Sequence, residues 1–298
     1  MLTVLTHDIL PVFAMLALGF VMGKAQTASV GEARAINRIA FLTLQPPLLF
    51  LLLTGIDLPS VRFDAIGLYA LCEAVAFAAS FLLARRVFGV PLAEAWLLGM
   101  AVVFVNSLLY IWPVTVLIYG EAETLPITAI VALDASATFA FFIVSVEFVT
   151  GRPARAALPR LIRNPVLLTI VLSLALNIAH VPVPEPLLTA ADFAGKAAAP
   201  MTLFALGVVL SSQPVTPGPA ATGIAAMKLV AFPALVWIAF ALLSPANPWT
   251  DLFVLNAAGP SGAMAFSLAL LHGVSTRNIA PVIVWTSVLS LASLAWLA

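Results

Sequence analysis

The chain has 298 residues, of which 63% are hydrophobic and only 9% are charged, with 13 basic and 13 acidic side chains. A soluble globular protein carries about a quarter charged residues, so this composition excludes a water-soluble enzyme. The net charge is zero, so the chain has no excess of basic residues for binding nucleic acid. The lone Cys72 cannot form an internal disulfide. The composition therefore predicts an all-α polytopic membrane protein.

Ten apolar segments, bounded by proline, glycine or charge, have the length of a membrane-spanning helix, which needs about 20 apolar residues. Ten such helices leave roughly nine residues for each loop or tail, so no soluble domain fits. The first segment is read as a span rather than a signal peptide, because Lys24 follows it and no basic region precedes it. In chain order the predicted spans are 4–23, 35–54, 65–84, 95–120, 125–148, 165–181, 190–211, 220–243, 250–273 and 278–297.

Basic residues between the spans predict the orientation of the chain, because cytoplasmic loops carry an excess of Lys and Arg. If the N-terminus is outside, only Arg62 and Lys196 lie in loops on the outer side. The cytoplasmic loops then hold Lys24, Arg34, Arg38, Arg85, Arg86, Arg152, Arg155, Arg160, Arg163 and Arg277. We expect both termini to be extracytoplasmic, with the bacterial inner membrane as the location.

Proline landmarks recur along the chain at a nearly constant spacing. Pro11 and Pro165 open the first and sixth spans and are 154 residues apart. The segments 46–50 and 200–204 are also 154 residues apart, and both read P-x-x-L-F. These landmarks predict an internal repeat. A helical bundle whose prolines only kink its helices is the alternative.

Each copy of this repeat contains five spans, an odd number, so the two copies must insert with opposite orientation. Inverted repeats with interrupted helices are typical of secondary transporters. The predicted organisation is a first inverted repeat at 1–150, a cytoplasmic linker at 151–164 and a second inverted repeat at 165–298.

Two prolines, Pro113 and Pro260, fall near the middle of the fourth and ninth spans, 147 residues apart. A mid-helix proline removes a backbone donor and clashes with the preceding turn, and in hydrocarbon the freed groups need partners. Half-helix N-termini suit an anionic ligand. Asn106, Asn256 and Ser261 would add donors and acceptors beside the breaks, so these five residues form the predicted substrate site. Helix–helix hydrogen bonding is the alternative role for the asparagines.

These motifs resemble the auxin efflux carrier family over essentially the whole chain. The similar segments are Asn106 to Gly120 with Pro113 inside it, Arg163-Asn164-Pro165, the run from Pro200 to Gly207, and Gly259-Pro260-Ser261. The resemblance implies a bile acid:sodium symporter-like fold whose fourth and ninth helices cross at their prolines. It also implies a scaffold domain from the first, second, sixth and seventh spans beside a mobile transport domain. Family members move small organic anions such as malonate, malate or auxin. Trp112 departs from the family, where a small residue is common.

Ionisable side chains within the spans are candidates for ion coupling, because such charges are rare in membranes and usually functional. Glu73 and Lys228 each lie eight residues into a span, at about 12 Å depth by helical rise. They could pair or gate a cation, whereas snorkelling is the alternative for Lys228. Asp134 is a candidate proton or cation carrier, with an inter-helix hydrogen bond as its alternative. Gln45, beside two prolines, completes this set.

Charged and imidazole groups near span ends are read as interfacial, namely Glu147 beside Arg152, and the histidines His180 and His272. The predicted function is secondary transport of a small organic anion, driven by protons or sodium, without a cofactor. A homodimer is possible from the sequence. No paired Cys/His spacing or nucleotide-binding motif indicates a metal or ATP site.

Two other functions remain as alternatives. A passive channel or a substrate sensor is one, and an intramembrane serine protease is the other, because residues 259–262 read G-P-S-G. A nucleophilic serine needs a histidine within hydrogen-bond reach. His272 lies eleven residues beyond Ser261, about 16 Å along the same helix, so we expect no enzyme activity.

Overall fold

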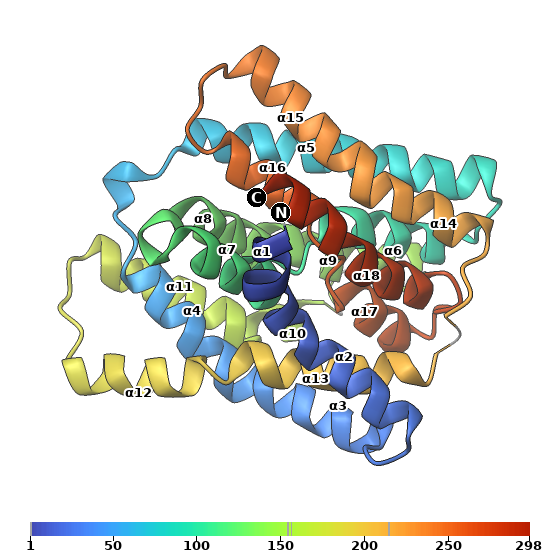
Figure 1. The fold of residues 1–298 in the computed structure, drawn as a ribbon, viewed down its shortest axis with the longest axis horizontal. Coiled ribbons are helices and arrows are strands. Elements are labelled where there is room, and N and C mark those ends of the chain that lie inside the picture. Colours follow the sequence, from blue (N-terminus) through green and yellow to red (C-terminus); the bar gives the residue numbers. More distant parts are fainter. Residues whose placement is uncertain (1, 154, 156, 214) are drawn as a thin grey trace.

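The protein is described by a computed structural model that covers residues 2–153, 155, 157–213 and 215–298 (Figure 1). Within these residues the regular elements are helices, and an isolated antiparallel bridge joins Val105 to Ser261. A helix satisfies its backbone hydrogen bonds internally, which hydrocarbon requires. In the described part of the chain, seven helices are long and apolar enough to cross a membrane: Leu2–Lys24, Val30–Thr54, Phe63–Val87, Leu125–Val149, Glu185–Ser211, Pro219–Leu243 and Ile279–Leu297.

Five of these long helices contain a π-helical turn (η1, η2, η4, η7 and η9), and a further π turn, η5, precedes α7. Two short 3-10 segments, η3 and η6, lie between helices. The first half consists of α1 (Leu2–Val4), η1 (Leu5–Ile9), α2 (Leu10–Lys24), α3 (Val30–Ile39), η2 (Ala40–Leu44), α4 (Gln45–Thr54), η3 (Leu58–Ser60), α5 (Phe63–Leu82), η4 (Leu83–Val87), α6 (Leu92–Val103), η5 (Ser107–Ile111), α7 (Trp112–Tyr119), η6 (Glu121–Glu123), α8 (Leu125–Leu133), η7 (Asp134–Thr138) and α9 (Phe139–Val149). The second half consists of α10 (Leu158–Ile162), α11 (Pro165–Ile178), α12 (Glu185–Gly195), α13 (Ala198–Ser211), α14 (Pro219–Ala226), η9 (Met227–Ala231), α15 (Phe232–Leu243), α16 (Thr250–Ala258), α17 (Met264–His272) and α18 (Ile279–Leu297).

The predicted spans coincide with these helices. The seven long helices cover the first, second, third, fifth, seventh, eighth and tenth spans, and α11 covers the sixth. The fourth and ninth spans each consist of two shorter stretches separated by a break, α6 followed by η5 and α7, and α16 followed by α17. The prediction of an all-helical polytopic membrane protein is therefore confirmed.

The helices pack as two groups (Figure 1). In the first group, α2 and α3 pack on α13, while α4 packs on α11 and α12. In the second group, α5 packs on α6 and α15, α15 packs on α16, and α14 packs on α18. The first group corresponds to the first, second, sixth and seventh spans. Both groups contribute to the cavity described below.

Within the first group, α2 and α13 cross at glycines that allow close backbone contact. A Cβ atom on Gly19 would collide with the carbonyl oxygen of Phe204, and one on Gly207 would collide with the carbonyl of Leu16. Without a hydrophobic driving force between helices in lipid, small residues at such crossings let van der Waals packing hold the helices together.

The predicted linker 151–164 contains the short helix α10, and its positions 154 and 156 lie outside the described residues. Asn164 ends this segment and begins α11, because its side-chain oxygen accepts from the backbone N–H groups of Val166 and Leu167. This N-cap fixes where the sixth span starts.

Candidate functional site

Two helix breaks meet near the middle of the molecule. Helix α6 ends at Val103, and the next helical segment starts at Ser107. In the ninth span, α16 ends at Ala258 and α17 starts at Met264. These two interruptions leave backbone N–H and C=O groups without helical partners, which must be satisfied elsewhere.

The two interrupted segments satisfy each other. The backbone N–H of Asn106 donates to the carbonyl of Pro260 at 3.0 Å, and that of Gly262 donates to Phe104 at 2.8 Å. The segments run antiparallel at this point. A short stretch of β-like pairing therefore ties the fourth span to the ninth where they cross.

The position of the first break corrects the expectation that both helices cross at their prolines. Pro113 lies seven residues after Asn106, near the start of α7, which follows η5 without interruption. The helix widens into a π turn directly before Pro113, and this turn accommodates the ring and its missing N–H. The residue opposite Pro260 is therefore Asn106, not Pro113.

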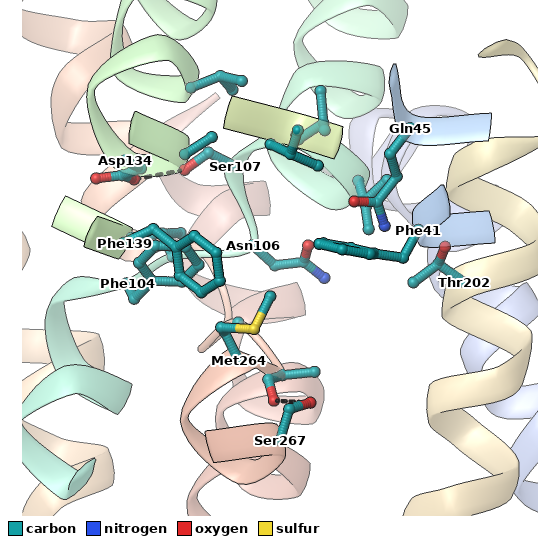
Figure 2. A pocket seen from close by; sticks show the side chains of 18 of the residues that line it. Phe41, Gln45, Phe104, Asn106, Ser107, Asp134, Phe139, Thr202, Met264 and Ser267 are labelled. Atoms are coloured by element: carbon teal, nitrogen blue, oxygen red, sulfur yellow. Dashed lines mark hydrogen bonds between the residues drawn. The ribbon is translucent and has the colours of Figure 1, made fainter. Parts of the chain in front are cut away.

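A cavity of about 130 Å³ lies beside this crossing (Figure 2). Both helix groups line it. Its polar side chains are Asn37, Gln45, Asn106, Ser107, Asp134, Thr202 and Ser267, and its apolar wall includes Phe41, Phe104, Phe139, Val166, Leu203 and Met264. Figure 2 shows the Asn106 amide pointing across the cavity toward Gln45 and Thr202, with the Phe41 ring between them.

Two half-helices begin at the cavity wall. Ser107 and Leu108 start η5, and Ala263 and Met264 are the cap and first residue of α17; all four line the cavity. The first N–H groups of a helix have no intrahelical partner, and the helix dipole gives this end a partial positive charge. The cavity thus receives two partial positive charges from backbone alone.

Three predicted residues line the cavity: Asn106, Gln45 and Asp134. The Ser107 hydroxyl donates to Asp134 Oδ2 at 3.4 Å, while the buried Oδ1 has no hydrogen-bond partner. Six predicted residues are not in the lining of this cavity: Pro113, Asn256, Pro260, Ser261, Glu73 and Lys228.

Asn256 and Ser261 instead connect the ninth span to its neighbours. The buried Asn256 Nδ2 donates to the Tyr69 hydroxyl of α5 at 2.9 Å. The backbone N–H of Ser261 donates to Thr286 Oγ1 of α18 at 3.2 Å. Both contacts position the crossing segments within the second group.

Glu73 and Lys228 lie deep in the second group without a salt bridge between them in the described part of the chain. Glu73 accepts a long hydrogen bond of 3.5 Å from Thr138 Oγ1. Lys228 is fully buried, which excludes snorkelling, and its ammonium donates to the carbonyl of Ala257. That carbonyl is at the C-terminal end of α16, where the helix dipole favours a cation.

Glu147 and His272, which lie near span ends, are buried within the protein. Glu147 forms an ion pair with Arg160 of α10, and its Oε1 lies 3.2 Å from His272 Nε2. This cluster joins the ends of α9 and α17 to the linker helix.

Apart from Gln45, sequence reasoning missed the cavity residues contributed by the first group, above all Thr202 and Phe41. Thr202 lies inside the P-x-x-L-F segment that marked the repeat, so a signal was present. Nothing in a single sequence shows that this segment faces the break at Asn106, which is 96 residues away.

A polytopic helical protein whose two interrupted helices cross beside a polar cavity has the construction of a membrane transport protein. The family model described as "Membrane transport protein" matches residues 149–297. The chain belongs to this family, which is the auxin efflux carrier family that its motifs resemble.

Two relatives align with nearly the whole chain. One from Rhizobium meliloti, named "Putative malonate transporter", is 28% identical over 97% of this chain and 93% of its own length. One from Methanothermobacter thermautotrophicus, named "Uncharacterized transporter", is 23% identical over 97% of this chain and 96% of its own. The family and these names confirm a transporter rather than an enzyme.

Proposed function

We propose that this protein is a secondary active transporter of a small organic anion, working by alternating access around the crossing of Asn106 and Pro260. The observation that carries the proposal is the pair of half-helix N-termini that open onto one cavity. Such ends suit an anion, and Asn106 adds a neutral amide donor. The relative named for malonate transport supports a carboxylate as the substrate.

We include in this proposal ten spans in two inverted five-helix repeats, with the first group as scaffold and the second as the moving unit. Asn106 and Pro260 are 154 residues apart, the same spacing as Pro11 and Pro165. In an inverted repeat, a residue can pair with the equivalent residue of the other repeat only where both lie at the pseudo-twofold axis. The antiparallel pairing of Asn106 with Pro260 is what such an axis requires.

A proton or a sodium ion is the proposed driver, with no cofactor. Among the described residues that line the cavity, Asp134 is the ionisable one, and its Oδ1 is buried without a hydrogen-bond partner. Glu73 and Lys228 are buried outside the cavity lining, and Gln45 lies across the cavity (Figure 2). Replacing Asp134 with Asn should remove the dependence of transport on the driving ion, measured as uptake with and without each gradient.

Solid-supported-membrane electrophysiology on proteoliposomes tests the proposal, with malonate, malate, lactate and indole-acetate as substrates. An acid-dependent current is expected, and Asn106→Ala should reduce it at least about tenfold through the lost amide contact. In the described residues the Asn106 side chain makes no internal hydrogen bond, so the variant should fold normally. Ser173→Ala, a buried change away from the cavity, is the control.

An unchanged current in Asn106→Ala would remove this residue from the site. Because electroneutral transport gives no current, labelled uptake is measured in parallel. A passive channel or a sensor, the alternatives open from the sequence, would show no uptake against a concentration gradient.

A further inference from the structure

Three buried ionisable side chains come from three different spans of the second helix group. Glu73 of α5, Asp134 of η7 and Lys228 of η9 are 5%, 4% and 0% exposed. Glu73 and Lys228 are 155 residues apart, close to the spacing of the proposed repeat, so they occupy matching positions in the third and eighth spans. Ionisable groups inside membrane spans are rare and usually functional.

The carboxyl groups of Glu73 and Asp134 lie within hydrogen-bonding reach of each other. Each also accepts from a hydroxyl, Glu73 from Thr138 at 3.5 Å and Asp134 from Ser107 at 3.4 Å. The other oxygen of each carboxyl is buried and receives no N–H or O–H donor. An ionised carboxylate has no proton to donate, and two carboxylates in contact do not both ionise. The contact therefore requires a shared proton.

Lys228 supplies the positive charge of this cluster. It forms no salt bridge in the described part of the chain, but it acts on both carboxyl groups through space. Its ammonium donates to the carbonyl of Ala257 at the end of α16 and lies 5.1 Å from the centre of the Phe232 ring. Both contacts suit an ammonium ion. With one proton on the carboxyl pair, the cluster then carries no net charge.

The other titratable groups around the pair are uncharged near neutral pH. Tyr69 and Cys72 lie on α5 close to Glu73, and a phenol or a thiol is ordinarily protonated at about pH 7. Among the described residues, the other charged groups of the helices around the pair lie near the ends of those helices: Asp64, Arg85, Arg86, Glu94, Glu147 and Asp251. The protonation of the pair therefore decides the charge of the cluster.

Asp134 connects this cluster to the cavity at the helix crossing, because it is one of the lining residues (Figure 2). It begins the π turn η7, and Lys228 lies in the π turn η9. Such turns within helices are frequent at functional sites. While the pair holds one proton, its negative charge opposes an anion in the cavity. A second proton removes that charge and leaves the ammonium of Lys228 uncompensated, which favours an anion.

The arrangement of oxygens suits a proton better than a sodium ion. Hard metal cations take several oxygen ligands spread around them. Here the two carboxyl groups contact each other directly, and a buried ammonium acts on both. No group of three or more acidic, His or Cys side chains in the described ranges is placed to hold a metal ion.

We propose that the Glu73–Asp134 carboxyl pair is the proton-binding site that couples transport to a proton gradient. The resting pair holds one proton. A second proton adds to the ionised carboxylate oxygen, forms an O–H bond there, and leaves to water after the cavity opens to the other side of the membrane. One proton is thus carried with each anion. The inference rests on the proposed transport function and names its coupling ion.

Infrared spectroscopy of the purified full-length protein in sodium-free buffer tests the site without a substrate. Ordinary carboxyl groups are ionised at about pH 7, so a C=O band of a protonated carboxyl that remains there reports the shared proton. Glu73→Gln and Asp134→Asn should each remove this band, because the remaining carboxylate can accept from the introduced amide. Added sodium should leave it unchanged. Glu94→Gln is the matched control, since it alters another buried carboxyl, which accepts from Asn278, and should keep the band.

Acidification of the proteoliposome lumen, followed with a trapped pH-sensitive dye, tests the coupling. Uptake of labelled malonate in the absence of sodium should acidify the lumen. Glu73→Gln should remove this acidification, and Glu94→Gln should retain it.

A band that persists in both variants of the pair would overturn the site. Loss of the band on adding sodium, or malonate uptake that requires sodium without acidification, would overturn the proton as the coupling ion but leave the proposed function intact. If the variants fail to fold, the effect of sodium on the unaltered chain still decides the ion. Absence of uptake for every acid while the band is present would count against the proposed function and not against the proton site.

Discussion

Buried and half-buried polar side chains in this protein differ in how completely their hydrogen bonds are satisfied. Asn177 of α11 donates to the carbonyls of Leu53, Thr54 and Ile56 at 3.1, 2.9 and 2.8 Å, so it ties α11 to the end of α4. Other buried side chains have an oxygen without a partner, both near the helix crossing, as in Asp134 and Ser261, and away from it, as in Ser80, Glu147 and Ser173.

The Glu147 cluster gives a prediction about stability. Arg160→Met removes the partner of a fully buried carboxylate, and removal of one member of a buried pair costs about 3–5 kcal/mol. Because the Arg160 side chain is 36% exposed, solvent screening reduces the expected loss to about 2 kcal/mol. Thermal unfolding in detergent should show a clear decrease in Tm.

The double variant Arg160→Met with Glu147→Gln is the control for this prediction, because it removes the buried charge as well as its partner. It should be more stable than the single variant Arg160→Met. Equal or lower stability would show that the ion pair does not hold α10 against α9 and α17.

At the scale of the elements, the crossing of α2 and α13 depends on Gly19. A side chain larger than hydrogen meets the backbone of Phe204 there, and overpacking costs about 1–3 kcal/mol. Gly19→Ala should therefore lower the Tm in detergent. Gly67→Ala is the matched control, since nothing lies within 4 Å of its added Cβ. An unchanged Tm in Gly19→Ala would contradict the close packing of these helices.

The crossing of the fourth and ninth spans depends on Gly262. A Cβ on this residue would lie 3.0 Å from the carbonyl oxygen of Phe104, to which its own N–H donates. Gly262→Ala should shift the paired segments and slow uptake by about tenfold or more, since small misplacements at a site have large effects. Expression and monodispersity should match those of Gly31→Ala, whose added Cβ has room. Unimpaired uptake would contradict a role for the pairing.

The positions of the helices were predictable, and the position of the first break was not. Long apolar segments with charged ends specify the spans, because about twenty consecutive apolar residues predict a spanning helix whatever the individual residues within it are. The proline pattern predicts the break at Pro113, but a π turn accommodates this proline and the helix is interrupted at Asn106 instead. The constant spacing of 154 residues would have placed Asn106 opposite Pro260.

Apart from Gln45, the part of the candidate site that was predictable comes from the helices outside the first group. Asn106 and Asp134 stand out as polar residues in apolar spans, and both line the cavity. Thr202 does not stand out, because threonine in a helix commonly bonds its own backbone. The position of Thr202 in the cavity lining depends on the packing of α13 against η5, a long-range contact that local sequence patterns do not predict.

For the whole molecule, the distribution of basic residues predicts the orientation. Alkaline phosphatase needs disulfides and is active only outside the cytoplasm, so its fusion to the C-terminus should be active. Fusion after Arg86, in a predicted cytoplasmic loop, should be inactive. The opposite pattern of activity would reverse the proposed topology.

Concentrative uptake is the measurement that tests the central claim most directly. Proteoliposomes holding the purified protein are given labelled malonate under an imposed proton or sodium gradient. Secondary active transport predicts accumulation above the external concentration, which collapses when an ionophore removes the gradient and is lost in Asn106→Ala. Uptake that only equilibrates, with or without the gradient, would contradict the account and indicate a passive pathway.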